Sequence, residues 1–124
     1  MLLSKYDWEM DQPGIEQAQV NICKQYGKEF FASPSESIIG VAIHTLGNHP
    51  IHGLRHKPEG NANGWYIWSG EYSSASDFFS PLHTAHMFEK APEVMNFLGL
   101  PPGCRFLLAE NYTDVWFDSA LLTS

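Results

Sequence analysis

Apolar residues recur at every third or fourth position near the start of the chain, and this spacing predicts an amphipathic helix over residues 13–31. The apolar positions are Ile15, Ala18, Ile22, Tyr26 and Phe30. Asp11-Gln12-Pro13 is typical of a helix start, because proline is tolerated in the first turn, and Ser33-Pro34-Ser35 is predicted to stop the helix. We expect this helix to pack on one face of a sheet.

The pattern then changes to short apolar runs between turn residues, which predicts strands. Residues 37–46 are apolar with small residues between, which indicates a strand covered on both faces. A second strand is predicted over 51–56 and a third over 64–69. Three neighbouring strands with short connections favour an antiparallel meander.

The third strand is the most aromatic stretch of the chain, and we expect it to be central in the sheet. Its sequence is Gly64-Trp65-Tyr66-Ile67-Trp68-Ser69-Gly70. Three aromatic residues in four positions place large rings on both faces of a strand. We expect Trp65 and Ile67 to face the main core and Trp68 to lie on the opposite face.

The second half of the chain predicts a loop, two short helices and a final hairpin. Residues 71–80 are polar and serine-rich and indicate an irregular loop. One helix is predicted over 82–90, and another opens at Ala91-Pro92-Glu93 and ends at Gly99 as its C′ residue. Strands at 105–109 and 112–118 follow.

Alternation in the last strand places Asp114, Trp116 and Asp118 on one face, and a tryptophan between two carboxylates is typical of an interface. We therefore predict that these residues, extended by Glu110 and Glu71, bind a partner. In the alternative interpretation a helix covers Trp116, and the acids are solvated neighbours.

These elements predict an α+β fold. The expected sheet has about five mostly antiparallel strands, with the N-terminal helix on one face and the two short helices at one edge, before the last hairpin. A chain of 124 residues and 14.0 kDa fits one domain, 1–124.

The net charge of −7 disfavours binding to nucleic acid or to anionic membranes and favours a basic partner protein. The N-terminus lacks the apolar segment of a signal peptide, and the longest apolar run, 38–43, is too short to span a bilayer, so a cytosolic protein is expected. Cys23 and Cys104 lie in apolar patterns, which predicts buried, reduced thiols.

Six histidines raise the question of a metal site, since four of them, His44, His49, His52 and His56, fall within thirteen residues. No cysteine or carboxylate accompanies them at ligand spacing, so we predict no bound metal and no cofactor. His44 is expected to be a hydrogen-bonded core residue.

The sequence contains no GxSxG motif, and both cysteines are expected to be buried, so we predict no enzyme activity. Ser73, Ser74 and Ser76 near Asp77 are expected to satisfy their own loop backbone. The alternative function is a small enzyme or ligand-binding domain, with a pocket between the aromatic strand and the segment 71–86.

The two arginines, Arg55 and Arg105, both lie in apolar segments, where a guanidinium generally needs a carboxylate partner. Glu71, Glu110 and Asp114 are the candidate partners. A structural ion pair and an anion-binding role both remain open for the arginines.

An ordered set of short motifs resembles the immunity-protein-thirty-three-like family, whose members are small bacterial proteins associated with polymorphic toxin systems. The motifs lie within about residues 51–122: Arg55, Gly64-Trp65, Ser69-Gly70-Glu71, Pro92-Glu93-Val94, Leu98-Gly99-Leu100-Pro101-Pro102-Gly103, Arg105-Phe106 and Asp114-Val115-Trp116-Phe117-Asp118. The resemblance implies an antitoxin-like protein that binds and blocks a cognate toxin, without catalysis or cofactor.

Overall fold

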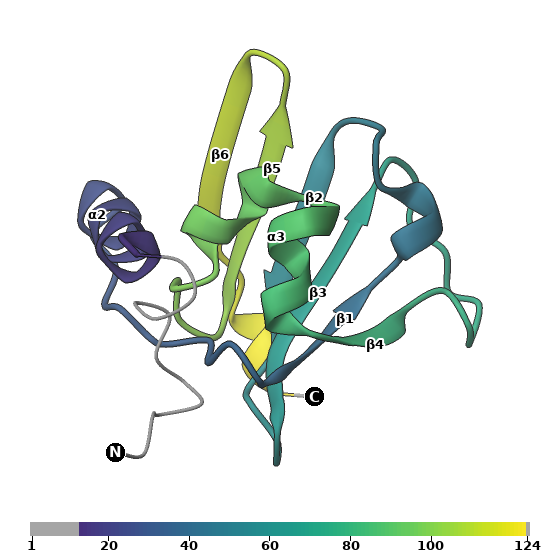
Figure 1. Ribbon diagram of the computed structural model, residues 1–124, viewed down its shortest axis with the longest axis horizontal. Coiled ribbons are helices and arrows are strands. Elements are labelled where there is room, and N and C mark those ends of the chain that lie inside the picture. The colour runs from purple at the N-terminus through teal and green to yellow at the C-terminus, as the bar shows by residue number, and fades with distance from the viewer. Residues whose placement is uncertain (1–12, 124) are drawn as a thin grey trace.

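The computed structural model describes residues 13–123, which form one six-stranded sheet with its helices mainly on one face (Figure 1). The strands are β1 (Ile38–Val41), β2 (Ile51–Arg55), β3 (Ala62–Ser69), β4 (Ser80–His83), β5 (Cys104–Ala109) and β6 (Tyr112–Phe117). The α-helices are α2 (Ile15–Gln25) and α3 (Met87–Lys90), and 3-10 helices span Ile43–Thr45, Thr84–His86, Pro92–Phe97 and Ser119–Leu122. The predicted α+β class is confirmed, with six strands rather than five.

The strand order is β4-β1-β3-β2-β5-β6, and four of the five strand pairs are antiparallel. The aromatic strand β3 is central, as predicted. The predicted meander is wrong, because β1 pairs in parallel with β3 and lies on the side of β3 away from β2. The local sequence pattern predicts where strands form, but the parallel pairing of β1 with β3 depends on contacts between distant segments.

Strand β4 occupies the start of the predicted 82–90 helix, which is therefore shorter than expected. Pro81 is tolerated there because β4 is an edge strand, paired only with β1 among the described strands. The helical part is limited to the 3-10 turn Thr84–His86 and the four residues of α3.

Helix α2 ends earlier than predicted, at Gln25 rather than near Phe31. Gly27 has a φ of 67°, and the N–H of Lys28 bonds to the carbonyl of Cys23 while that of Gly27 bonds to the carbonyl of Lys24. These two bonds form a Schellman motif, for which a left-handed glycine is the preferred residue. The predicted start at Asp11-Gln12 lies outside the described residues.

Helix α2 packs on the 3-10 helix Pro92–Phe97 rather than directly on the sheet. The side chain of Gln19 donates to the carbonyl of Met95, and the thiol of Cys23 donates to the carbonyl of Gly99. A Cβ on Gly99 would lie within 3 Å of Gln19 and Phe30, so this glycine permits close packing and is not the left-handed C′ residue predicted.

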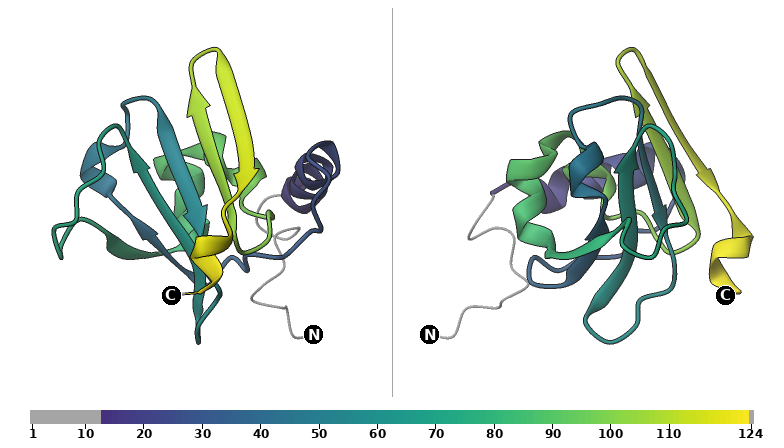
Figure 2. Two further views of the ribbon diagram at one scale, coloured as in Figure 1. Left: turned by 180° about the vertical axis from the view of Figure 1, so that it is seen from behind. Right: turned by 90° about the vertical axis from the view of Figure 1, so that its right-hand side faces the viewer.

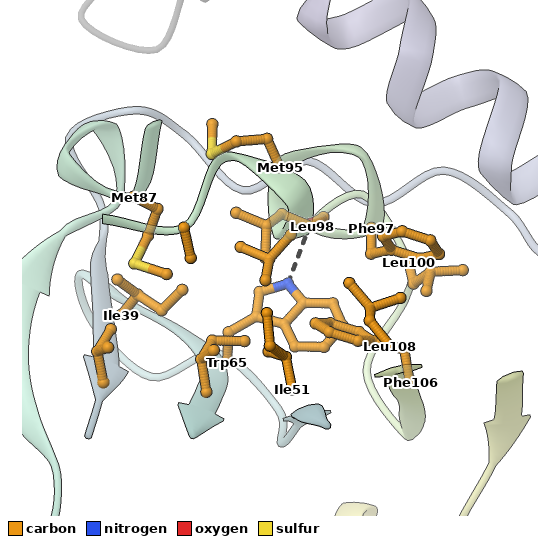
Figure 3. Packing of buried hydrophobic residues seen from close by; sticks show 14 of the residues in the cluster. Ile39, Ile51, Trp65, Met87, Met95, Phe97, Leu98, Leu100, Phe106 and Leu108 are labelled. Atoms are coloured by element: carbon orange, nitrogen blue, oxygen red, sulfur yellow. Dashed lines mark hydrogen bonds between the residues drawn. The ribbon is translucent and has the colours of Figure 1, made fainter. Parts of the chain in front are cut away.

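The short helices cover one face of the sheet, here called the inner face (Figure 1). The prediction that they lie at one edge is therefore wrong. Figure 3 shows Met87, Met95 and Leu98 packed over the strands. Trp65 and Ile67 are buried beneath them, as predicted, and Trp68 belongs to a separate cluster on the other face. Burying a large side chain here stabilises the fold by about 1.5–3 kcal/mol.

Candidate partner-binding face

The sheet face away from α3, here called the outer face, is covered only in part (Figure 2). Directly paired residues lie on the same face of a sheet, so the register identifies the side chains that share it. One row across all six strands contains Pro81, Gly40, Tyr66, Leu54, Arg105 and Trp116, and the next contains Trp68, His52, Leu107 and Asp114. The outer face therefore combines aromatic and charged residues.

The loop 71–79 folds over one side of the outer face and forms an aromatic cluster with β3. The ring centroid of Tyr72 lies 5.4 Å from that of Trp68, and the centroid of Phe79 lies 5.1 Å from that of Tyr66. Phe78 and Phe79 contact edge to face at 4.9 Å. Tyr72 is nevertheless 60% exposed. These rings fix the loop and leave one aromatic residue free to contact a partner.

A groove of about 390 Å³ separates this aromatic cluster from β6. Trp68 and Tyr72 line one side, and Trp116 and Arg105 line the other. The complete lining is His52, Gly53, Trp68, Gly70, Tyr72, Arg105, Phe106, Leu107 and Trp116. A surface with this shape can accept a protruding side chain of another molecule.

Arg105 and Asp118 form an ion pair beside the groove, with 3.0 Å between the guanidinium nitrogen and the carboxylate oxygen. The guanidinium also lies over the ring of Trp116, 5.8 Å from its centroid. The other oxygen of Asp118 accepts the N–H of Ala120. Hydrogen bonding to Arg105, and then to Ala120, lowers the pKa of Asp118. The pair therefore holds Arg105 against Trp116.

His52 lies at the base of the groove with its ring stacked on Trp68, 4.9 Å between centroids and 16° between planes. Burial lowers the pKa of His52, and the positive charge of Arg105 lowers it further. The ring is consequently neutral at pH 7, and it contributes a flat, uncharged surface to the groove.

The structure brings together part of the predicted partner-binding set. Asp114 and Trp116 share the outer face of β6, and Glu110 lies in the β5–β6 turn at the start of that strand. Asp118 forms an ion pair with Arg105. Glu71 follows β3, and the strands β2 and β5 lie between β3 and β6, so Glu71 is separated from the other predicted residues. Trp116 is 37% exposed, so the alternative in which a helix covers it is wrong.

His52, Tyr72 and Arg105 also belong to this surface, although the local sequence pattern did not predict them there. Alternation on β2 and β5 is the signal that could place His52 and Arg105 on one face, once the two strands are known to pair. Tyr72 was hidden in a polar loop, where only its aromatic character distinguishes it.

Arg55 is fully buried, and the carboxylate partners predicted for it are wrong, because its guanidinium meets backbone carbonyls. The acceptors are the carbonyls of Phe31, Ala32, Asn63, Leu98 and Leu100. Burial lowers the pKa of Arg55 to about 10, which leaves it charged at pH 7. Its donors are used within the fold, so an anion-binding role is not supported. For Arg105 the partner is Asp118, rather than any of the three acids predicted.

The histidines of the described residues are spread over the molecule, and residues 13–123 contain no group of three potential ligands placed to hold a metal ion. His83 and His86 have ring centroids 6.2 Å apart. His44 is exposed in a 3-10 turn, where its ring contacts Phe78, so its predicted place in the core is wrong. Both cysteines are buried and free, as predicted.

The serine loop and the alternative pocket also have definite positions. The hydroxyl of Ser73 accepts the N–H of Ala75, which satisfies loop backbone as expected. A hollow of about 230 Å³ lies beside Tyr66, Phe79 and Pro81, where the alternative function placed a pocket. None of the helices among residues 13–123 is long and apolar enough to cross a membrane.

The model of the Imm33-like domain matches residues 18–118. The chain belongs to the Imm33-like domain family. The match begins within α2, well before the region near residue 51 where the motifs first suggested the resemblance, and it includes every residue that lines the groove. No curated protein and no solved structure matches this Imm33-like domain.

Proposed function

We propose that this single-domain protein is a cytoplasmic immunity protein that binds a cognate bacterial toxin and blocks it, without catalysis or cofactor. Membership of the Imm33-like domain family supports this function in general terms. The observation that supports the binding face is the exposure of Trp116 and Tyr72 on opposite sides of the outer-face groove.

Aromatic residues around a hollow are the usual anchors of protein interfaces, because their burial removes a large apolar area from water at a small cost in side-chain entropy. Asp114 and Glu110 add negative charge at the same side of the sheet. We infer that the toxin places a basic or aromatic side chain against Trp116 and covers the groove.

The test uses the toxin domain encoded next to this gene, purified as an inactive variant, and isothermal titration calorimetry. We expect Trp116→Ala to weaken binding by about 2 kcal/mol, which is roughly 30-fold in Kd. Phe88→Ala is the matched control, because Phe88 is 38% exposed but lies on α3, over the other face of the sheet. It should leave the affinity unchanged.

Absence of binding by the unaltered protein, together with failure to protect cells that express the active toxin, would refute the immunity function. Loss of affinity in Phe88→Ala but not in Trp116→Ala would instead move the binding face to the helical side. Both variants must first show unchanged circular dichroism and thermal stability.

A further inference from the structure

Strand β6 is the last strand of the sheet, and within residues 13–123 it pairs only with β5. Figures 1 and 2 show the tip of the β5–β6 hairpin projecting beyond the neighbouring strands. Tyr112 and Thr113 are exposed there, as are Trp116 and Phe117 further along. One long side of β6 is thus available for pairing.

The alternation of hydrogen-bonded pairs between β5 and β6 shows which backbone groups of β6 point to this open side. The N–H of Asp118 donates to the carbonyl of Gly103, its direct partner in the register, at 2.7 Å. Hydrogen-bonded and non-hydrogen-bonded pairs alternate along an antiparallel ladder, so Trp116, Asp114 and Tyr112 also point their backbone groups at β5. The N–H and C=O groups of Thr113, Val115 and Phe117 therefore face outward.

The two edges of the sheet differ in how they are protected against pairing. The opposite edge, β4, has four residues, one of which is Pro81. Strand β6 has six residues, contains neither proline nor lysine, and keeps a regular register with β5 throughout. Short strands, proline, charged side chains and bulges are the usual protection of edge strands, and among these β6 has only the carboxylate of Asp114. Strand β6 is therefore less protected against pairing than β4, as expected of a strand that pairs with a partner.

We propose that β6 pairs, through its outward backbone groups, with a strand of the toxin; this inference rests on the proposed immunity function. The ring of Phe117 already contacts Lys28, at 5.5 Å from the ammonium nitrogen to the centroid, so pairing centres on Thr113 and Val115. Neighbouring strands share faces, so the toxin residue beside Asp114 would be basic and the one beside Trp116 apolar or arginine.

A second copy of this chain fits the same edge poorly. Antiparallel self-pairing that uses the outward groups can centre on Thr113, Asp114, Val115 or Trp116. A centre at Asp114 places the two copies of that carboxylate opposite one another, and a centre at Trp116 places Asp114 opposite Asp118. A centre at Thr113 or Val115 brings the two Asp114 residues into diagonal contact, and like charges in such positions are destabilising. A basic strand avoids this repulsion.

The experiment compares Thr113→Pro with Thr113→Ala in binding to the inactive toxin domain. Proline removes the outward N–H without removing a bond to β5, and it is compatible with an edge strand. We expect Thr113→Pro to weaken binding about tenfold, as loss of an interface hydrogen bond does, and Thr113→Ala to change it less than about twofold.

Amide hydrogen exchange of the unaltered protein gives a second measurement that does not depend on a folded variant. Addition of the toxin domain should slow exchange at Thr113 and Val115 in particular, because these N–H groups have no partner on β5. Equal affinity of a folded Thr113→Pro variant, or unchanged exchange at both amides in the complex, would overturn the pairing.

Failure of this inference can be separated from failure of the proposed function. Toxin binding that is weakened by Trp116→Ala but not by Thr113→Pro would leave the outer face as the binding site and exclude the edge. Absence of any binding by the unaltered protein would refute both. Slowed exchange at Thr113 and Val115 in the protein alone, dependent on its concentration, would assign the edge to a second copy and overturn the proposal.

Discussion

Arg55 and Trp65 donate hydrogen bonds to the same carbonyl, that of Leu98. The indole N–H also contacts the hydroxyl of Ser33, and the guanidinium reaches the carbonyl of Phe31. Two side chains of the sheet thus hold the segment after α2 and the segment after the short helices. The polar parts of these large residues determine where the covering layer lies.

The first residue-scale prediction concerns Trp65, which is 1% exposed. Trp65→Ala should destabilise the protein by about 3–5 kcal/mol, because it leaves a cavity and removes the indole hydrogen bond to the carbonyl of Leu98. Urea denaturation measures the change, with Trp116→Ala as a control that should cost less than about 1 kcal/mol. A Trp65→Ala protein as stable as the parent would contradict the packing shown in Figure 3.

The second residue-scale prediction concerns the pKa of His52. Burial is the larger cause of the lowered pKa, and the positive charge of Arg105 is the smaller one. Arg105→Met removes only the charge, so the pKa of His52 should rise but stay below the ordinary value near 6.5. Lys90→Met, on α3 over the other face, removes the same charge and should leave it unchanged. Titration of the ring protons by NMR distinguishes these outcomes.

The same shift fixes the sign of a pH dependence. The folded-state pKa of His52 lies below the unfolded-state value, so the unfolded chain binds the proton more readily. The contribution of His52 to stability is therefore complete above about pH 6.5 and is lost as the pH falls through the folded-state pKa. In a His52→Gln variant, the free energy of unfolding should therefore depend less steeply on pH in this range. An unchanged pH dependence would mean that other groups cause it.

At the scale of elements, local pattern predicted the helix α2, the central strand β3 and the final hairpin. It also placed Asp114 and Trp116 on one face, because alternation within a strand is a local property. It failed for β4, since Ser80-Pro81-Leu82-His83 has little strand character and is held by pairing with β1. The end of α2 was predictable from Gly27, which the longer apolar periodicity obscured.

The groove could not be predicted in the same way. His52 and Trp68 lie opposite one another only because β2 pairs with β3, and Arg105 reaches this surface only because β5 pairs with β2. The parallel pairing of β1 with β3 brings Gly40 beneath the ring of Tyr66, where a Cβ would approach the ring to 2.7 Å. These contacts depend on strand order, which the short connections suggested incorrectly.

At the scale of the whole molecule, one face of the sheet carries the main core, and the other carries a small buried cluster around Trp68 beside exposed aromatic residues. The net charge of −7 adds a long-range field that would attract a basic toxin before contact. In the proposed complex the two features would act on different steps, because buried contacts at Trp116 would slow dissociation and the carboxylates would speed encounter.

The last prediction concerns the rate of association with the toxin, which the carboxylates are expected to increase. Replacing Asp114 and Glu110 by Asn and Gln removes two charges next to the proposed face but leaves the Arg105–Asp118 pair intact. We expect association with the toxin domain to slow by about three- to tenfold at low salt and to depend less on salt, with little change in dissociation. Stopped-flow fluorescence measures both rates.

The matched control replaces Glu16 and Glu93 by Gln, which makes the same change in net charge on exposed residues of the helical side. If the toxin approaches the outer face, the control should slow association less than the outer-face variant when both are measured at physiological salt, where screening limits each charge to about 8 Å. Equal slowing in both double variants would mean that net charge alone attracts the toxin, and it would remove the electrostatic argument for the outer face. The binding contacts of Trp116 would then have to identify that face by themselves.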